Sequence, residues 1–200
     1  VGIMDLTAAY MAAAIVNKQQ DSKPTVGKQD KTNPTGEVFN NYQSNTATGD
    51  YSHAEGTKTR APGNNSHAEG EITEALGYDS HAEGYYTQAK GSCSHAEGYN
   101  TSALGGNSHA EGDYATASGP RSHAEGRYTI AASDCQHVQG KYNVGDSEGK
   151  YAFIIGNGVS PADRSNAFAV DWQGKIYINN SSVGIDLNDL LAKVTALENK

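Results

Sequence analysis

Side chains alternate between small and polar along most of this chain, and the alternation repeats every fourteen residues. The segment Ser-His-Ala-Glu-Gly starts at Ser52 and recurs at Ser66, Ser80, Ser94, Ser108 and Ser122, before a degenerate copy at 136–140. Successive side chains of a strand point to opposite faces, so Ser, Ala and Gly should share one face and His and Glu the other. A fixed period of this length predicts a solenoid.

The remainder of each repeat predicts a second, shorter strand. Alanine lies six residues before each motif histidine, and glycine lies four residues before it in all repeats except the last, which has Ser133. Thr87–Gly91 again alternates, with Thr, Ala and Gly on one face. Glycine at this density is costly in a helix. We therefore expect an all-β fold, a thin parallel β-roll of fourteen-residue coils over residues 45–172.

Apolar residues replace the polar ones toward the ends of the repeat region. Phe153 and Ile155 take the places of His and Glu after a two-residue insertion, and Phe168 and Val170 follow fifteen residues later. Phe39 lies fourteen residues before His53. Terminal repeats are commonly atypical because they cap the stack, so we expect apolar capping coils from about residue 150.

The flanking segments carry different patterns. Residues 1–20 have heptad-like apolar spacing and predict a helix, and residues 21–44 predict a linker. Residues 173–182 predict a hairpin or neck with its turn at Gln173–Gly174. Residues 183–200 predict the start of a three-stranded coiled coil, the alternative being one amphipathic helix packed on its own chain. Its seam comprises Val183, Leu187, Leu190, Val194 and Leu197.

Composition narrows the class of protein. Only 36% of the residues are hydrophobic and 23 are glycine, so a wide apolar core is excluded and oligomerisation is expected to help stabilise the chain. The net charge of −8 argues against nucleic acid as a partner. No apolar run approaches the roughly 20 residues of a membrane span, so membrane insertion is not expected.

The repeat resembles the head repeats of trimeric autotransporter adhesins (YadA-like heads), whose fourteen-residue units carry Ser-Val-Ala-Ile-Gly. The resemblance covers about residues 45–172 and implies a left-handed parallel β-roll in a homotrimer around a common axis. His and Glu here replace that family's usual Val and Ile. The Ser-His-Ala-Glu-Gly form, followed by Tyr151–Gly158, also resembles phage and prophage tail proteins of Gram-positive hosts.

Stacked coils about 4.8 Å apart would place His over His and Glu over Glu. Glutamates in a row repel one another unless opposite charges lie close by. If the resemblance holds, this face points toward the three-fold axis, and His of one chain pairs with Glu of the next. The predicted trimer interface comprises His53, Glu55, His67, Glu69, His81, Glu83, His95, Glu97, His109, Glu111, His123, Glu125, His137, Phe153, Ile155, Phe168, Val170, Leu187, Leu190, Val194 and Leu197.

Such pairing has a consequence for titration. Paired histidines would have raised pKa values and paired glutamates lowered ones, which predicts maximal stability in mildly acidic solution.

Two alternative chemistries use the same residues. Three histidines around an axis could bind Zn or Ni, which makes candidates of His53, His67, His81, His95, His109, His123 and His137. Structural pairing is favoured, because a ligand at every coil exceeds what one metal site needs, and we expect no metal and no cofactor. Catalysis is disfavoured because identical His–Glu sites on a packed face offer no cleft and no differentiated acid and base.

Variable side chains are expected on the outward face of the second strand. Tyr86, Tyr114, Tyr128 and Tyr142 are candidates for a receptor surface, because tyrosine suits both sugar stacking and protein contact. The alternative is that tyrosine simply favours exposed strand positions. Cys93 and Cys135 lie three repeats apart, roughly 14 Å on this spacing, which is too far for a disulfide within the chain.

These features together predict a non-enzymatic structural and adhesive fibre segment of a phage or prophage tail. Its partner would be a glycan or protein of the host cell surface, and its location the virion tail or an extracellular surface. Two alternatives stay open: a head segment of a trimeric bacterial surface adhesin, and a segment of a tail protein whose self-cleaving peptidase or chaperone domain lies beyond Lys200.

Overall fold

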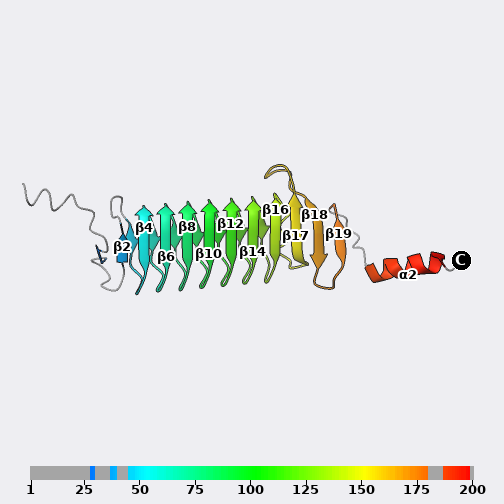
Figure 1. Cartoon of the computed structure of the whole chain (residues 1–200), viewed down its shortest axis with the longest axis horizontal. Helices are drawn as coiled ribbons and strands as arrows, with labels where there is room; N and C mark the ends of the chain where they lie inside the picture. Colours follow the sequence, from blue (N-terminus) through cyan, green and yellow to red (C-terminus); the bar gives the residue numbers. More distant parts are fainter. Residues whose placement is uncertain (1–27, 30–36, 40–44, 180–186, 199–200) are drawn as a thin grey trace, which may run out of the picture.

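The computed structural model describes residues 28–29, 37–39, 45–179 and 187–198, and its repeat region is an elongated β-solenoid (Figure 1). Two sheets run along the long axis. The first comprises β1 (Lys28–Gln29), β2 (Glu37–Phe39), β4 (His53–Thr57), β6 (His67–Glu71), β8 (His81–Tyr85), β10 (His95–Tyr99), β12 (His109–Asp113), β14 (His123–Arg127), β16 (His137–Lys141), β17 (Tyr151–Asn157), β18 (Asn166–Asp171) and β19 (Ile176–Ile178). The second comprises β3 (Thr46–Ala47), β5 (Arg60–Ala61), β7 (Glu74–Ala75), β9 (Gln88–Ala89), β11 (Ser102–Ala103), β13 (Thr116–Ala117) and β15 (Ile130–Ala131).

Each coil contributes one strand to each sheet, and equivalent residues of successive coils lie side by side. His95 pairs with His109 and Ala96 with Ala110 in the parallel β10–β12 ladder. In the second sheet Ser102 pairs with Thr116. The register shifts by two residues where β16 meets β17, so that His137 lies opposite Phe153. The predicted parallel β-solenoid of fourteen-residue coils is therefore confirmed; its handedness and the trimer remain implications of the resemblance.

The core between the two sheets consists of small side chains. Alanines of both strands, such as Ala96 and Ala103, have no exposed surface, and Thr87 and Thr101 are equally buried. The motif serines are buried too, and the Oγ of Ser94 donates a hydrogen bond of 2.7 Å to the carbonyl of Gly91. Because alanine, serine and threonine fill this space, no large apolar residue is needed until Ile154.

The motif glycine corrects one expectation, since it does not share the inner face with Ser and Ala. Gly98 is exposed, with a φ of +105°. A Cβ there would lie 2.3 Å from the carbonyl oxygen of Gly112 in the next coil. The other glycine of the repeat, Gly91, is the buried one, and a Cβ on it would lie 1.9 Å from the oxygen of Gly105. Both positions require glycine because neighbouring backbones approach closely.

The predicted placement of the tyrosines on the second strand is wrong. Tyr86, Tyr114, Tyr128 and Tyr142 occupy the corner between the two strands, each with a positive φ between 44° and 57°. That conformation is uncommon for a bulky residue. The backbone remains hydrogen-bonded at these corners, since the N–H of Tyr114 donates to the Tyr99 carbonyl at 2.9 Å. The coil-to-coil ladder thus continues around the turn.

The solenoid ends differently from the expected capping coils. Figure 1 shows β18 running opposite to β17, and its register places Phe168 opposite Ile155 and Val170 opposite Phe153. Residues 158–172 therefore form part of an antiparallel meander, and the last parallel strand ends at Asn157. β18 pairs antiparallel with β19, and Gly174 between them has a φ of +83°, so the chain turns at the expected Gln173–Gly174 position.

The flanks are described only in part. The first sheet extends into the segment predicted as a linker, where β1 and β2 pair antiparallel. The β2–β4 register places Phe39 opposite Glu55, not at the expected histidine position. The predicted helix over 1–20 lies outside the described residues. Helix α2 (Leu187–Glu198) agrees with the predicted C-terminal helix. Within the described parts of the chain, no helix is both long and apolar enough to span a membrane.

Candidate functional site

The motif histidines form a column on the outer face of the first sheet, in which the rings from His67 to His123 are stacked nearly parallel. The ring centroids of His67 and His81 are 4.7 Å apart with an interplanar angle of 1°, and those of His81 and His95 are 4.8 Å apart at the same angle. Their side chains are about one-third exposed in the single chain, 35% for both His81 and His95. The expected His-over-His and Glu-over-Glu arrangement is confirmed by the strand register.

Each histidine from His81 onward approaches the glutamate of the preceding coil. The Nε2–Oε1 distance is 3.5 Å for His81–Glu69, His95–Glu83 and His109–Glu97, 3.1 Å for His123–Glu111 and 3.8 Å for His137–Glu125. His53 instead approaches Glu55 of its own coil at 3.6 Å. The sequence predicts pairing of His with Glu between chains. Pairing within the chain arises because coil stacking brings the glutamate one repeat earlier beside the ring.

Four histidines have pKa values that shift, in the single chain, in the direction opposite to the one expected for paired histidines. Burial lowers the pKa of His67, His81, His109 and His137, and neighbouring histidines lower it further. Desolvation of a charged ring outweighs its attraction to the nearby carboxylates in the single chain.

The pKa values of the stacked glutamates shift in different directions along the column. Burial and hydrogen bonds to Glu55 and Glu83 raise the pKa of Glu69 to about 7. A hydrogen bond to Glu83 and burial raise that of Glu97 to about 7 as well. The pKa of Glu83 is lowered by its hydrogen bond to Glu97. Stacked carboxylates cannot all be ionised cheaply, so the expectation of uniformly lowered glutamate pKa values is wrong for Glu69 and Glu97.

Both polar columns continue into an apolar patch at the C-terminal end of the sheet. The register aligns Phe153 with His137 and Ile155 with Gln139, and then Val170 with Phe153 and Phe168 with Ile155. The apolar patch comprises Phe153, Ile155, Phe168, Val170, Ile176 and Ile178, all of which are partly or fully exposed. An open depression of about 500 Å³ lies at the junction, lined by Glu111, Gly112, Glu125, Gly126, Gln139, Gly140 and Ile155.

The corner tyrosines form a stacked ladder instead of a set of open rings. Tyr114 and Tyr128 stack at 4.4 Å and 3°, and Tyr128 and Tyr142 at 4.8 Å and 14°. Tyr85 and Tyr99 continue the ladder at 5.3 Å, so its members are Tyr86, Tyr85, Tyr99, Tyr114, Tyr128 and Tyr142. Tyr142 is only 6% exposed, which removes it as a receptor contact. The stacked faces of Tyr114, Tyr128 and Tyr142 are covered by neighbouring rings and are not free to stack on sugars, whereas Tyr86 meets Tyr85 edge-on and is 45% exposed.

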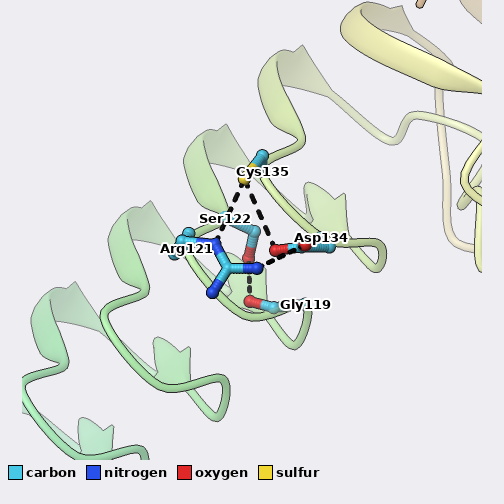
Figure 2. Close-up of polar contacts among 5 residues, drawn as sticks. All are labelled: Gly119, Arg121, Ser122, Asp134 and Cys135. Carbon is cyan, nitrogen blue, oxygen red and sulfur yellow. Dashed lines mark hydrogen bonds and ion pairs between the residues drawn. The ribbon is translucent and has the colours of Figure 1, made fainter.

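The opposite corner carries the two cysteines, which are exposed and, as expected, form no disulfide with each other. Figure 2 shows Cys135 beside Arg121 of the preceding coil, whose Nε donates to the thiol sulfur at 3.3 Å. Arg121 also pairs with Asp134, and the pKa of its guanidinium is raised by these hydrogen bonds to Cys135 and Asp134. This corner is a polar link between two coils.

Comparison with known families supports the resemblance. Two copies of the YadA head domain repeat match this chain, over residues 96–122 and 110–132. No curated protein matches the sequence significantly. The chain therefore contains YadA-like head repeats, and the strand register shows the same unit continuing on both sides of the matched residues, from His53 to Lys141.

Proposed function

We propose that this chain is a non-enzymatic segment of a homotrimeric adhesive fibre located at an extracellular surface. The observation that carries the proposal is the apolar patch, which continues the His and Glu columns on one sheet face. Contiguous exposed apolar surface marks an interaction site in soluble proteins. The match to YadA head repeats supports the same class of function, since adhesin heads of that family are trimeric surface structures.

Other copies of this chain are the proposed occupants of that face. The face carries a column of histidines beside a column of glutamates, so His of one chain can hydrogen-bond to Glu of the next around a three-fold axis. Beside the glutamates, exposed glycines such as Gly112 and Gly126 form the floor of the depression and leave room for a neighbouring side chain. Helix α2 supports the same stoichiometry, because Leu190, Val194 and Leu197 are exposed along its predicted seam.

The fibre could belong to a phage or prophage tail or to a bacterial surface adhesin. The tail-fibre hypothesis rests on the Ser-His-Ala-Glu-Gly form of the repeat, whereas the family match favours an adhesin head. In both, the partner would be a glycan or protein of a host surface. Immunogold labelling of intact bacteria and of purified virus particles with antibodies to this chain distinguishes the two, because only one of the samples should carry the label.

Sedimentation velocity of the full chain tests the trimer. We expect the wild type to sediment at three times its monomer mass and the double variant Phe153→Ser/Phe168→Ser to dissociate, since both side chains belong to the apolar patch. Val159→Ser is the matched control, because Val159 is 67% exposed and lies outside the patch. A wild-type monomer, or a trimer unaffected by the double variant, would contradict the proposal.

A further inference from the structure

We propose that the His–Glu face binds divalent first-row metal ions of the Zn²⁺ and Ni²⁺ type between consecutive coils. Each ion would take the Nε2 of one histidine and a carboxylate oxygen of the glutamate one coil earlier. These ligands come from a single chain. The proposal therefore differs from three histidines meeting on a trimer axis, and it does not depend on the trimer.

The distances between donor atoms fit one ion per step. Two ligands that bind a tetrahedral zinc ion at 2.0–2.1 Å lie about 3.4 Å from each other. The measured Nε2–Oε1 separation is 3.5 Å at three successive steps and 3.1 Å at the next. A third donor lies close by, because five His–Glu groups hold three ligand atoms within 4.8 Å of one another: His53/Glu55/His67, His67/Glu69/His81, Glu83/His95/Glu97, Glu97/His109/Glu111 and Glu111/His123/Glu125.

The histidine nitrogens are available for coordination. The Nε2 atoms of His67, His81, His95, His109 and His137 are buried and have no hydrogen-bond partner. The Nε2–Oε1 separations of His81, His95, His109 and His137 from glutamate are 3.5–3.8 Å, which is long for a hydrogen bond. A buried polar atom left unsatisfied costs free energy that a ligand would recover. Imidazole combined with carboxylate favours zinc or nickel, whereas calcium and magnesium prefer oxygen donors alone.

The glutamate column supplies an electrostatic reason for binding a cation. Carboxylates stacked in register repel one another, and Glu97 lies directly beside Glu83 on adjacent parallel strands. A divalent ion bound between two coils would neutralise two of these charges at once.

Isothermal titration with ZnCl₂ and NiCl₂ tests the proposal on the full chain. The background is Cys93→Ser/Cys135→Ser, which removes both thiols as ligands. We expect several ions per chain. The near-isosteric variant Glu83→Gln/Glu97→Gln/Glu111→Gln should lower the stoichiometry by about half, because these residues belong to three of the five groups.

Glu71→Gln/Glu148→Gln is the matched control, because both glutamates are exposed and lie outside the metal-candidate groups. Circular dichroism confirms that each variant keeps its β structure. No binding at millimolar metal, binding lost with the two cysteines, or equal stoichiometry in the triple variant and the control would each overturn the proposal. Sedimentation in EDTA tests the trimer separately, so a monomer that binds zinc would contradict only the trimer.

Discussion

The polar coils and the apolar end occupy the same face of the same sheet, yet they present opposite chemistry. In β10 the outward side chains are His95 and Glu97, and in β17 at equivalent positions they are Phe153 and Ile155. The inward side chains differ in size, from Ala96 to Ile154, but both are apolar and fully buried. The coil thus tolerates very different outward residues, because buried apolar side chains and the backbone ladder hold it together.

Within each repeat, the inward positions therefore determine folding and the outward positions determine what the face binds. Steric limits apply at the two glycines of each repeat, where neighbouring backbones nearly touch. The outer His and Glu positions face no such limit, so they are free to specify what the face contacts. Perturbing an inner position should therefore cost stability, whereas perturbing an outer one should change assembly, metal binding or pH response.

The largest effect is expected from Gly105→Ala. Its Cβ would lie 2.1 Å from the carbonyl oxygen of Gly119 in the next coil, so the two backbones must separate. We expect a loss of about 2–3 kcal/mol in the free energy of unfolding, measured by urea denaturation.

Gly106→Ala is the adjacent control for this change. The nearest atom to a Cβ there is the Ser92 oxygen at 3.8 Å, an ordinary contact. Its stability should match the wild type within about 0.5 kcal/mol. Equal effects of the two substitutions would contradict the steric account of the coil.

An intermediate effect is expected from Tyr128→Asn, which interrupts the tyrosine ladder. Tyr128 stacks on Tyr114 and Tyr142, and Asn suits the same corner, because Asn100 occupies the equivalent position with a φ of 53°. We expect a loss of about 1–2 kcal/mol, the value of two aromatic contacts, by urea denaturation.

Tyr78→Asn serves as the comparison for the ladder, because Tyr78 is 53% exposed and lies outside it. It should be nearly neutral. If Tyr128→Asn left stability unchanged but abolished binding to host surfaces, the tyrosines would act as a receptor surface and the structural interpretation would be wrong.

The smallest effect is expected from Glu97→Gln, and it should depend on pH. The pKa of Glu97 is raised from 4.5 to about 7 on folding, so its favourable contribution is complete below 4.5 and is lost as pH rises through 7. Glutamine stays neutral, so the Tm should equal the wild-type value at pH 4.5 and exceed it at pH 8.

Glu83→Gln should have the opposite sign at pH 8. The pKa of Glu83 is lowered on folding, so its ionised form contributes stability above 4.5 that glutamine cannot supply. The lowered pKa values of His67, His81, His109 and His137 add a loss of stability as pH falls below 6.5 in all these proteins. Thermal melts from pH 4.5 to 8 compare the three chains, and a common pH profile would contradict uneven proton sharing.

Short-range order was predictable from the sequence. The fourteen-residue spacing of the histidines predicted the coil, and period-two alternation placed Ser and Ala inside and His and Glu outside. The two-residue insertion correctly put Phe153 and Ile155 at the His and Glu positions. The prediction for Phe168 and Val170 was wrong, because their spacing fits a parallel coil and an antiparallel strand equally well. They were assigned to another coil, whereas they lie on an antiparallel strand.

The sequence by itself determined the period of this protein, its thin core of small residues and the chemistry of its outer columns, because these depend on alternation and repetition along the chain. Only the tertiary structure decided what each outer residue contacts. His81 meets Glu69 of the preceding coil, the corner tyrosines cover one another's faces, and the motif glycine lies outside. The physical reason is that coils stack through space, so distances between residues fourteen apart follow from backbone pairing and corner geometry, and alternation within one strand does not specify them.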